Sequence, residues 1–238
     1  MEINEFEKVV RQEQGSLSLA FPALMRKVYV WMTLALAISG VTAYGVAHSE
    51  NLLMLIYGNR LVFWGLIIAE LALVFTVSAA INRLSLTTAT LLFILYSVVN
   101  GATLSYIFAA FSTAVITKVF FITAGTFGAM AAYGYFTKSD LSKMGKIAFM
   151  ALIGLIIASV VNLFMHSPVL DLIVSYAGVL VFVGLTAWDT QKIKQMLAMQ
   201  EFADEGAQKI ALMGALSLYL DFINLFIYLL RIFGGSRD

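Results

Sequence analysis

Long apolar runs alternate with short polar links along nearly the whole chain. Seven runs approach or exceed the ~20 apolar residues that a helix needs to cross a hydrocarbon core of ~30 Å. They lie at residues 28–47, 61–82, 86–110, 113–136, 146–166, 168–188 and 211–233. Because most links are very short, consecutive helices should be antiparallel neighbours. The pattern predicts an all-α integral membrane protein with seven transmembrane helices.

Two segments complete this organisation. Residues 1–27 are predicted to form a cytoplasmic N-terminal segment, and residues 28–238 a single seven-helix membrane domain. The longest link, from Asp189 to about Lys209, is amphipathic ("QKIKQMLAMQEFADEGAQKI"). We expect it to continue the sixth helix and then to turn at the membrane interface.

Composition supports lipid as the solvent and removes several function classes. Hydrophobic residues make up 61% of the chain and charged residues 12%, whereas soluble domains carry about 25% charged residues. A net charge of +1, with no basic stripe, gives no signal for nucleic-acid binding. Cysteine is absent, which excludes disulfides and thiol catalysis. No cofactor motif or phosphate loop is present, so the sequence predicts neither an enzyme nor a resident cofactor.

The positions of lysine and arginine predict the orientation. Eleven of them lie in the N-terminal segment and in the second, fourth and sixth links, against Arg60, Arg231 and Arg237 on the other side. The positive-inside rule therefore places the N-terminus in the cytoplasm. The C-terminus lies outside if the seventh segment crosses fully and inside if it re-enters; the sequence leaves both open. Compact loops favour a prokaryotic plasma membrane, with an organelle membrane as the alternative in a eukaryote.

The seventh segment carries a polar stripe inside an apolar helix. Steps of three and four residues, which keep to one helix face, connect Gly214, Ser217, Asp221, Asn224, Tyr228 and Arg231. Asp221 costs roughly 2.5–3.5 kcal/mol at a helix centre on insertion scales. The stripe predicts that this helix faces protein or water along its length, as a central helix does.

Two further acids lie at membrane depth or near it. Glu70 is near the middle of the second span, and Asp189 closes the sixth in "VGLTAWDTQKIKQM". Intramembrane acids are rare and mark pathways or sensors, which is our interpretation of Glu70 and Asp221. For Asp189 the sequence leaves two roles open, a pathway or sensing group and an ordinary interfacial acid beside Lys192. Asp171 we assign to the first turn of the sixth helix, where the helix dipole favours it.

Other polar and small residues are interpreted as structural. Asn100 and Asn162 are expected to bond across helices, and His48 and His166 to be structural groups at span ends. Small residues at helix-packing spacing are expected to make close helix contacts. They are Gly40, Gly45, Gly125, Gly128, Ala129 and Ala132.

Two C-terminal stretches carry a family resemblance. "GLTAWDTQKIK" (184–194) and "ALSLYLDFINLFIYLLRIFG" (215–234) resemble the sixth-helix signature and the last helix of the Bax inhibitor motif family. The resemblance implies a six-helix bundle around a central seventh helix. It also implies a pH-sensitive leak of calcium controlled by paired aspartates, which map to Asp189 and Asp221, while the family's helix-two acid maps to Glu70.

The family pattern also has an arginine at the end of helix two that can latch onto the helix-six aspartate. Here the stretch reads "SAAINRLS", and Arg83, the candidate latch, lies slightly later than the pattern expects.

The mechanism follows from the two carboxylates. Two acids brought together in a poorly hydrated bundle cannot both ionise cheaply, so they should titrate as a unit and tie the sixth helix to the seventh. Calcium prefers six to eight oxygen ligands. The aspartates with Asn224, carbonyls and waters would give a transient calcium site, and Ser217, Asn224 and Glu70 would line the ion pathway.

Several alternatives remain or are excluded. A retinal protein needs a lysine in the last helix, and residues 211–233 contain none. An intramembrane aspartyl protease carries Gly-x-Gly-Asp, whereas the acids here follow "TAW" and "LYL". A proton-coupled solute transporter stays open because buried acids also serve proton relays. A non-transporting scaffold that binds other membrane proteins stays open as well.

Overall fold

The protein is helical throughout the part of the chain that the structure describes. The computed structural model describes residues 2–200 and 202–234, with side chains from Ala20 onward. Helices within these ranges are α1 (Glu2–Ala47), α2 (Glu50–Tyr57), α3 (Arg60–Ala80), α4 (Leu86–Leu104), α5 (Tyr106–Ala110), α6 (Thr113–Phe136), α7 (Ser142–Met165), α8 (Pro168–Ala198) and α9 (Glu205–Phe233). Seven segments are long and apolar enough to cross a membrane. The predicted fold class is confirmed.

Several helices extend beyond the apolar runs that predicted them. Helix α1 begins well before the first run and continues without a break through Arg26 and Lys27. The sixth continues to Ala198 through the amphipathic link, as expected. Asp204 then caps α9, its Oδ1 accepting a hydrogen bond of 2.8 Å from the amide of Ala207. Helices α1, α8 and α9 are thus longer than the apolar runs that predicted them.

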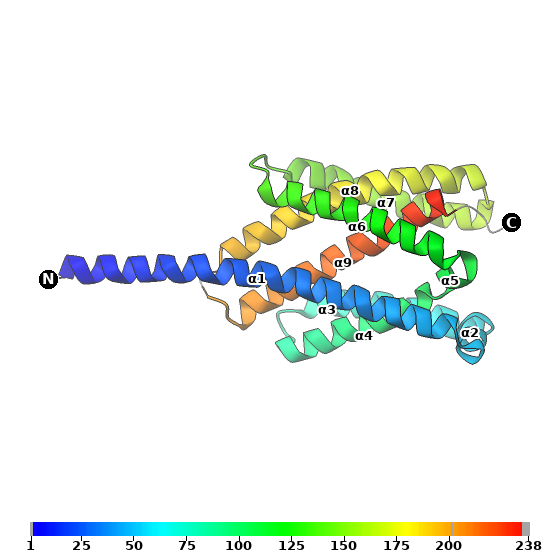
Figure 1. Ribbon diagram of the computed structural model, residues 1–238, viewed down its shortest axis with the longest axis horizontal. Helices are drawn as coiled ribbons and strands as arrows, with labels where there is room; N and C mark the ends of the chain where they lie inside the picture. Colours follow the sequence, from blue (N-terminus) through cyan, green and yellow to red (C-terminus); the bar gives the residue numbers. More distant parts are fainter. Residues whose placement is uncertain (1, 201, 235–238) are drawn as a thin grey trace.

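Helix α9 is the central element. Figure 1 shows it running obliquely through the bundle, between α3 and α4 on one side and α6 to α8 on the other. It packs against α1, α4, α6 and α8. In its most apolar window 67% of the residues are buried, against 6% for α3 and 11% for α7. The central last helix, which the polar stripe predicted, is therefore confirmed.

Contacts at both of its ends show that α9 crosses the whole bundle. At one end, Gln208 Oε1 accepts a hydrogen bond of 3.0 Å from Lys27 Nζ, and Glu205 Oε1 accepts one of 3.0 Å from the amide of Leu86. At the other end, Arg231 lies 3.2 Å from Asp171 in the first turn of α8. Helix α9 therefore runs the whole length of the bundle, which favours the full crossing over the re-entrant alternative.

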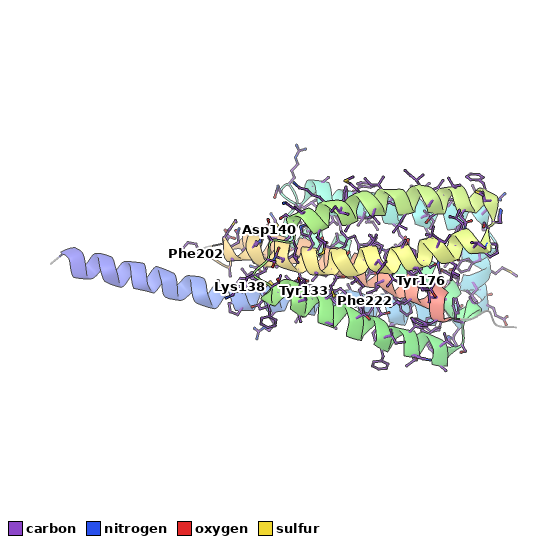
Figure 2. The ribbon with its side chains drawn as sticks, turned by 90° about the horizontal axis from the view of Figure 1, so that it is seen from above. Tyr133, Lys138, Asp140, Tyr176, Phe202 and Phe222 are labelled. Carbon is purple, nitrogen blue, oxygen red and sulfur yellow. The ribbon has the colours of Figure 1, made fainter. Side chains whose placement is uncertain are left out.

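The links with most of the basic residues gather at one end of the bundle. Figure 1 places the α3–α4, α6–α7 and α8–α9 links at the end from which α1 extends. Figure 2 shows Lys138, Asp140 and Phe202 there, whereas Tyr176 lies toward the opposite end. This end, called the basic end below, is the one that we expect in the cytoplasm.

The glycines that make close helix contacts are different from those predicted. A Cβ at Gly40, Gly45, Gly125 or Gly128 would meet nothing within 4 Å, so the prediction for these four was wrong. Close approach occurs instead at Gly101 against α1 and at Gly134 and Gly145 against α8. Spacing along one helix identifies a smooth face, but it does not say whether that face meets a helix or lipid.

Candidate functional site along the central helix

The polar stripe on α9 passes from one cavity to another. Gly214 and Ser217 line a cavity at the basic end, which also contains Asp189 and has a volume of about 370 Å³. Asn224 lines a second cavity, which contains Glu70 and has a volume of about 620 Å³. We call them the Asp189 cavity and the Glu70 cavity. Asp221 lines neither of them and lies between Ser217 and Asn224 on the helix.

Basic side chains line part of the Asp189 cavity. It is formed by the end of α3, the second half of α8 and the start of α9, and both Lys192 and Lys209 line it. The charge of Lys192 acts on Asp189, and the Lys192 ammonium also lies 5.0 Å from the centre of the Trp188 ring. Asp189 is half-buried. A cation entering from this end would meet one carboxylate and two competing ammonium groups.

Close packing fixes the backbone of α8 next to Asp189. A Cβ at Gly134 would lie 2.1 Å from the carbonyl oxygen of Ala187, and one at Gly145 would lie 2.2 Å from the Trp188 ring. Gln191 is buried and bonds the α6–α7 link, accepting from the amide of Leu141 at 2.9 Å and donating to the carbonyl of Ser139 at 2.8 Å. Helices α6 and α7 therefore hold α8 in place on both sides of Asp189.

Asp221 is the one buried acid among the described side chains. Its side chain is 5% exposed, and its Oδ2 atom has no hydrogen-bond partner. Asp189 of α8 and Ser217 of α9 line one cavity, and Asp221 lies one turn beyond Ser217, so the two carboxylates lie near one another across the α8–α9 contact. A buried polar atom without a partner costs about 1–3 kcal/mol. Such a group in a well-packed helix is a signature of function rather than of stability.

Glu70 is held by a hydrogen bond from α4. The hydroxyl of Thr103 donates to Glu70 Oε1, and the same hydroxyl lies 2.9 Å from the carbonyl oxygen of Asn100. The Tyr57 hydroxyl lies beside them, donating to the carbonyl of Thr103 at 2.8 Å. Tyr57, Asn100 and Thr103 all line the Glu70 cavity. The acid is thus fixed in place at the wall of the cavity.

A buried network connects Glu70 to the central helix. Tyr219, which is fully buried, donates a hydrogen bond of 2.8 Å to Asn100 Oδ1, and its hydroxyl lies 2.7 Å from Ser39 Oγ. The expected bond of Asn100 across helices is therefore confirmed. Sequence reasoning missed Ser39, Thr103 and Tyr219, because hydroxyls in apolar helices commonly bond their own backbone and give no pattern.

Arg83 is exposed just after α3 and is in neither of the two ion pairs found among the described residues. Its neighbour Asn82, rather than Arg83, lines the Asp189 cavity. The latch assignment stays a prediction.

The remaining structural interpretations have mixed outcomes. His166 ends α7 in the left-handed conformation with φ 50°, and His48 bonds the carbonyl of Tyr44 at 2.8 Å, so both serve local structure as expected. Asn162 was wrongly predicted to bond across helices. Its Oδ1 accepts a 3.0 Å hydrogen bond from the amide of Ser167, in the turn between α7 and α8. Asp171 lies in the first turn of α8, as assigned, and additionally pairs with Arg231.

Within the described residues, no three side chains of His, Cys, Asp or Glu cluster closely enough to hold a metal ion. The acids lie instead in sequence along α9 and its neighbours. Carboxylate and amide oxygens thus follow one another singly along the bundle. The transient calcium site at Asp189 and Asp221 stays a prediction.

Known proteins match nearly the whole chain in sequence. The model of a family described as "Inhibitor of apoptosis-promoting Bax1" matches residues 22–238. The inner membrane protein YbhL of Escherichia coli K12 is 50% identical over 214 residues, which cover 90% of this chain and 92% of the relative. A protein of Borreliella burgdorferi is 44% identical with the same coverage. One of Deinococcus radiodurans is 40% identical over 99% of this chain and the whole relative.

Proposed function

Because the chain belongs to the Bax inhibitor family of membrane proteins, we propose that it is a calcium leak channel whose opening depends on pH. The observation that carries this proposal is the position of Asp221. It is a buried carboxylate with an unpartnered oxygen, on the central helix, between one cavity lined by Asp189 and another lined by Glu70.

The order of polar groups suits a path for cations. From the basic end the path passes Asp189 and Ser217, then Asp221, and then Asn224 and Glu70. Carboxylate and amide oxygens are the ligands that calcium prefers. Single ligands spaced along a helix bind the ion too weakly to retain it, which suits passage rather than storage.

Control by pH follows from the paired aspartates. Asp221 is in no ion pair among the described residues, and Asp189 lies across from the same stretch of α9, in a cavity that it shares with Ser217. Two such acids in a poorly hydrated contact hold a proton between them, and their titration belongs to the pair. The shared proton connects α8 to α9, and its loss separates the two carboxylates by repulsion. The change of this contact opens or closes the path at Asp221.

The same reasoning gives the expected surroundings and partners. The chain lies in a prokaryotic plasma membrane with the N-terminus and the basic end in the cytoplasm. Calcium and protons are its ligands, calcium as the transported ion, and no cofactor takes part. Arg83 follows Asn82, which lines the Asp189 cavity. A movement of the Arg83 side chain into this cavity would let it pair with Asp189 in place of the shared proton.

The test is calcium flux through the purified protein in liposomes that contain a calcium-sensitive dye, measured from acidic to neutral pH. The proposal expects flux above that of empty liposomes, with a clear dependence on pH. An absence of flux at every pH would overturn the proposal and favour a non-transporting scaffold for other membrane proteins. Flux only in the presence of a co-transported solute would favour a proton-coupled transporter.

A further inference from the structure

A groove lies between α1 and α6 at the basic end of the bundle. Both helices pack on α9, but between them a space of about 520 Å³ remains. Its walls are mostly apolar or small side chains. Those used below are Met25, Arg26 and Tyr29 of α1 and Phe127, Gly128 and Ala132 of α6. We call this space the Arg26 groove. It lies within two membrane spans and apart from both cavities on the ion path.

The wall toward the membrane is unfilled. Gly128 is exposed, and a Cβ placed on it would meet nothing within 4 Å. Ala132, one turn further along α6, is exposed as well. Inside a bilayer such a space does not stay empty, and its occupant must be apolar over most of its length.

The chemistry of the groove favours a lipid over a helix of another protein. Its walls are apolar along the membrane span, and a guanidinium lies at one end. An acyl chain is one methylene wide, follows a narrow channel and leaves no unsatisfied polar group.

Positive charge surrounds the basic end of the groove. Arg26 lines it directly and is exposed. Lys194 lies 5.0 Å from the ring centre of Tyr135 and donates a hydrogen bond of 2.7 Å to the Tyr135 carbonyl, and Tyr135 is itself part of the wall. Lys138, two residues after the end of α6, is exposed at the same end (Figure 2). Arg26 thus lies in the groove, Lys194 lies beside its Tyr135 wall, and Lys138 adds positive charge at the same end of the bundle.

Arg26 is in neither of the two ion pairs among the described residues. Asp140, the acid of the nearby α6–α7 link, is engaged by its own helix start, its Oδ1 accepting a 2.9 Å hydrogen bond from the Ser142 amide. The guanidinium of Arg26 is therefore available for an anion, and guanidinium binds phosphate through two parallel hydrogen bonds.

From these contacts we propose that the Arg26 groove is a binding site for one anionic phospholipid of the leaflet at the basic end. The acyl chain lies between α1 and α6 against Phe127 and Gly128. The phosphate binds Arg26, with Lys194 and Lys138 adding charge. Basic pockets between helices on the cytoplasmic side are suited to such headgroups. The lipid would bridge two helices that both contact α9, and so would affect how firmly the central helix is held.

The test is native mass spectrometry of the purified protein with phosphatidylglycerol or phosphatidylcholine that carry identical acyl chains. Arg26→Gln removes the phosphate ligand, and Lys143→Gln, an exposed cation at the same end, is its control. Gly128→Leu fills the groove. Its control is Gly154→Leu, which adds the same side chain at an exposed glycine with nothing within 4 Å.

The wild-type protein is expected to retain one phosphatidylglycerol in preference to phosphatidylcholine. Arg26→Gln should lower retention of phosphatidylglycerol about fivefold, the usual contribution of one basic side chain near an anionic surface. It should lower retention of phosphatidylcholine less, because the choline cation offsets the charge of that lipid's phosphate. Gly128→Leu should lower retention of both lipids. Both controls should match the wild type.

Three outcomes would overturn the proposal. Equal retention by each variant and its control would place the lipid elsewhere. Equal retention of the two lipids by the wild type would remove the role of Arg26. A stoichiometric membrane protein bound in place of lipid, and lost in Gly128→Leu, would show that the groove is a protein interface.

Discussion

Arg231 in the last turn of α9 pairs with Asp171 in the first turn of α8 at 3.2 Å. The pair fixes the far end of the central helix to the start of its antiparallel neighbour, and both side chains are well exposed, 39% and 49%. Exposed ion pairs contribute about 0.2–1 kcal/mol. Asp171→Asn should therefore lower the unfolding free energy by no more than about 1 kcal/mol, and by less in high salt. Thermal unfolding in detergent at two salt concentrations measures this, and a salt-independent loss would contradict it.

Tyr219 should contribute more to stability than a lipid-facing tyrosine. Tyr219→Phe keeps the ring but leaves Asn100 Oδ1 without the 2.8 Å hydrogen bond that it now accepts. The expected loss of unfolding free energy is about 1 kcal/mol. This value lies between the mean contribution of a hydrogen bond inside a membrane and the cost of leaving a buried acceptor unsatisfied. Tyr176→Phe, at a tyrosine that is 55% exposed on α8, is the matched control and should be neutral. Equal melting temperatures for the two variants would show that the network contributes nothing.

Gly134 and Gly125 should differ sharply although both lie on α6. Gly134→Ala would put a Cβ 2.1 Å from the carbonyl oxygen of Ala187, and a helix backbone cannot yield locally. Overpacking of this kind costs about 1–3 kcal/mol. Gly125→Ala meets open space and should leave the melting temperature unchanged or raise it slightly. Because Gly134 packs beside Asp189, its variant should also disturb the pH dependence of flux. Equal stability of the two variants would argue against the close α6–α8 contact.

Asp140 gives a pH-dependent contribution outside the membrane. Hydrogen bonds from Ser142 lower the pKa of this carboxyl below its usual range. Because the pKa of Asp140 is lower in the folded than in the unfolded state, the ionised carboxylate stabilises the fold. This contribution is fully present above the unfolded pKa of about 3.9. This contribution is lost as the pH falls through the folded pKa. The difference in melting temperature between wild type and Asp140→Ala should thus be present at neutral pH and vanish in strong acid. A difference that grows toward acid would have the wrong sign.

Much of the architecture was predictable because a bilayer demands it. Apolar runs of sufficient length gave all seven spans, and the stripe from Ser217 to Arg231 identified α9 as central, since polar groups there must face protein. The amphipathic pattern after Asp189 predicted the extension of α8 to Ala198. The continuation of α1 through Arg26 and Lys27 was not predicted, because these residues interrupt the apolar run but not the helix.

The partners of individual groups were much less predictable. Gly125 and Gly128 have the spacing of a helix contact, yet both are exposed with nothing within 4 Å of an added Cβ, whereas Gly134 and Gly145 make the contacts beside Asp189. Tyr219 was unremarkable in sequence, but it forms the hydrogen bond that links α9 to Asn100. Which neighbour a helix face meets depends on the arrangement of the other helices, and periodicity within one helix contains no information about it.

The central claim concerns Asp221, and the most direct measurement is calcium flux of Asp221→Asn in liposomes across acidic to neutral pH. Asp171→Asn is the control, because it removes an acid from the same helix pair outside the path. The account predicts that Asp171→Asn keeps the pH profile of the wild type. Asp221→Asn should give flux that no longer varies with pH, since one carboxylate of the pair can no longer exchange its proton. A wild-type pH profile in Asp221→Asn, with normal folding and expression, would contradict the account.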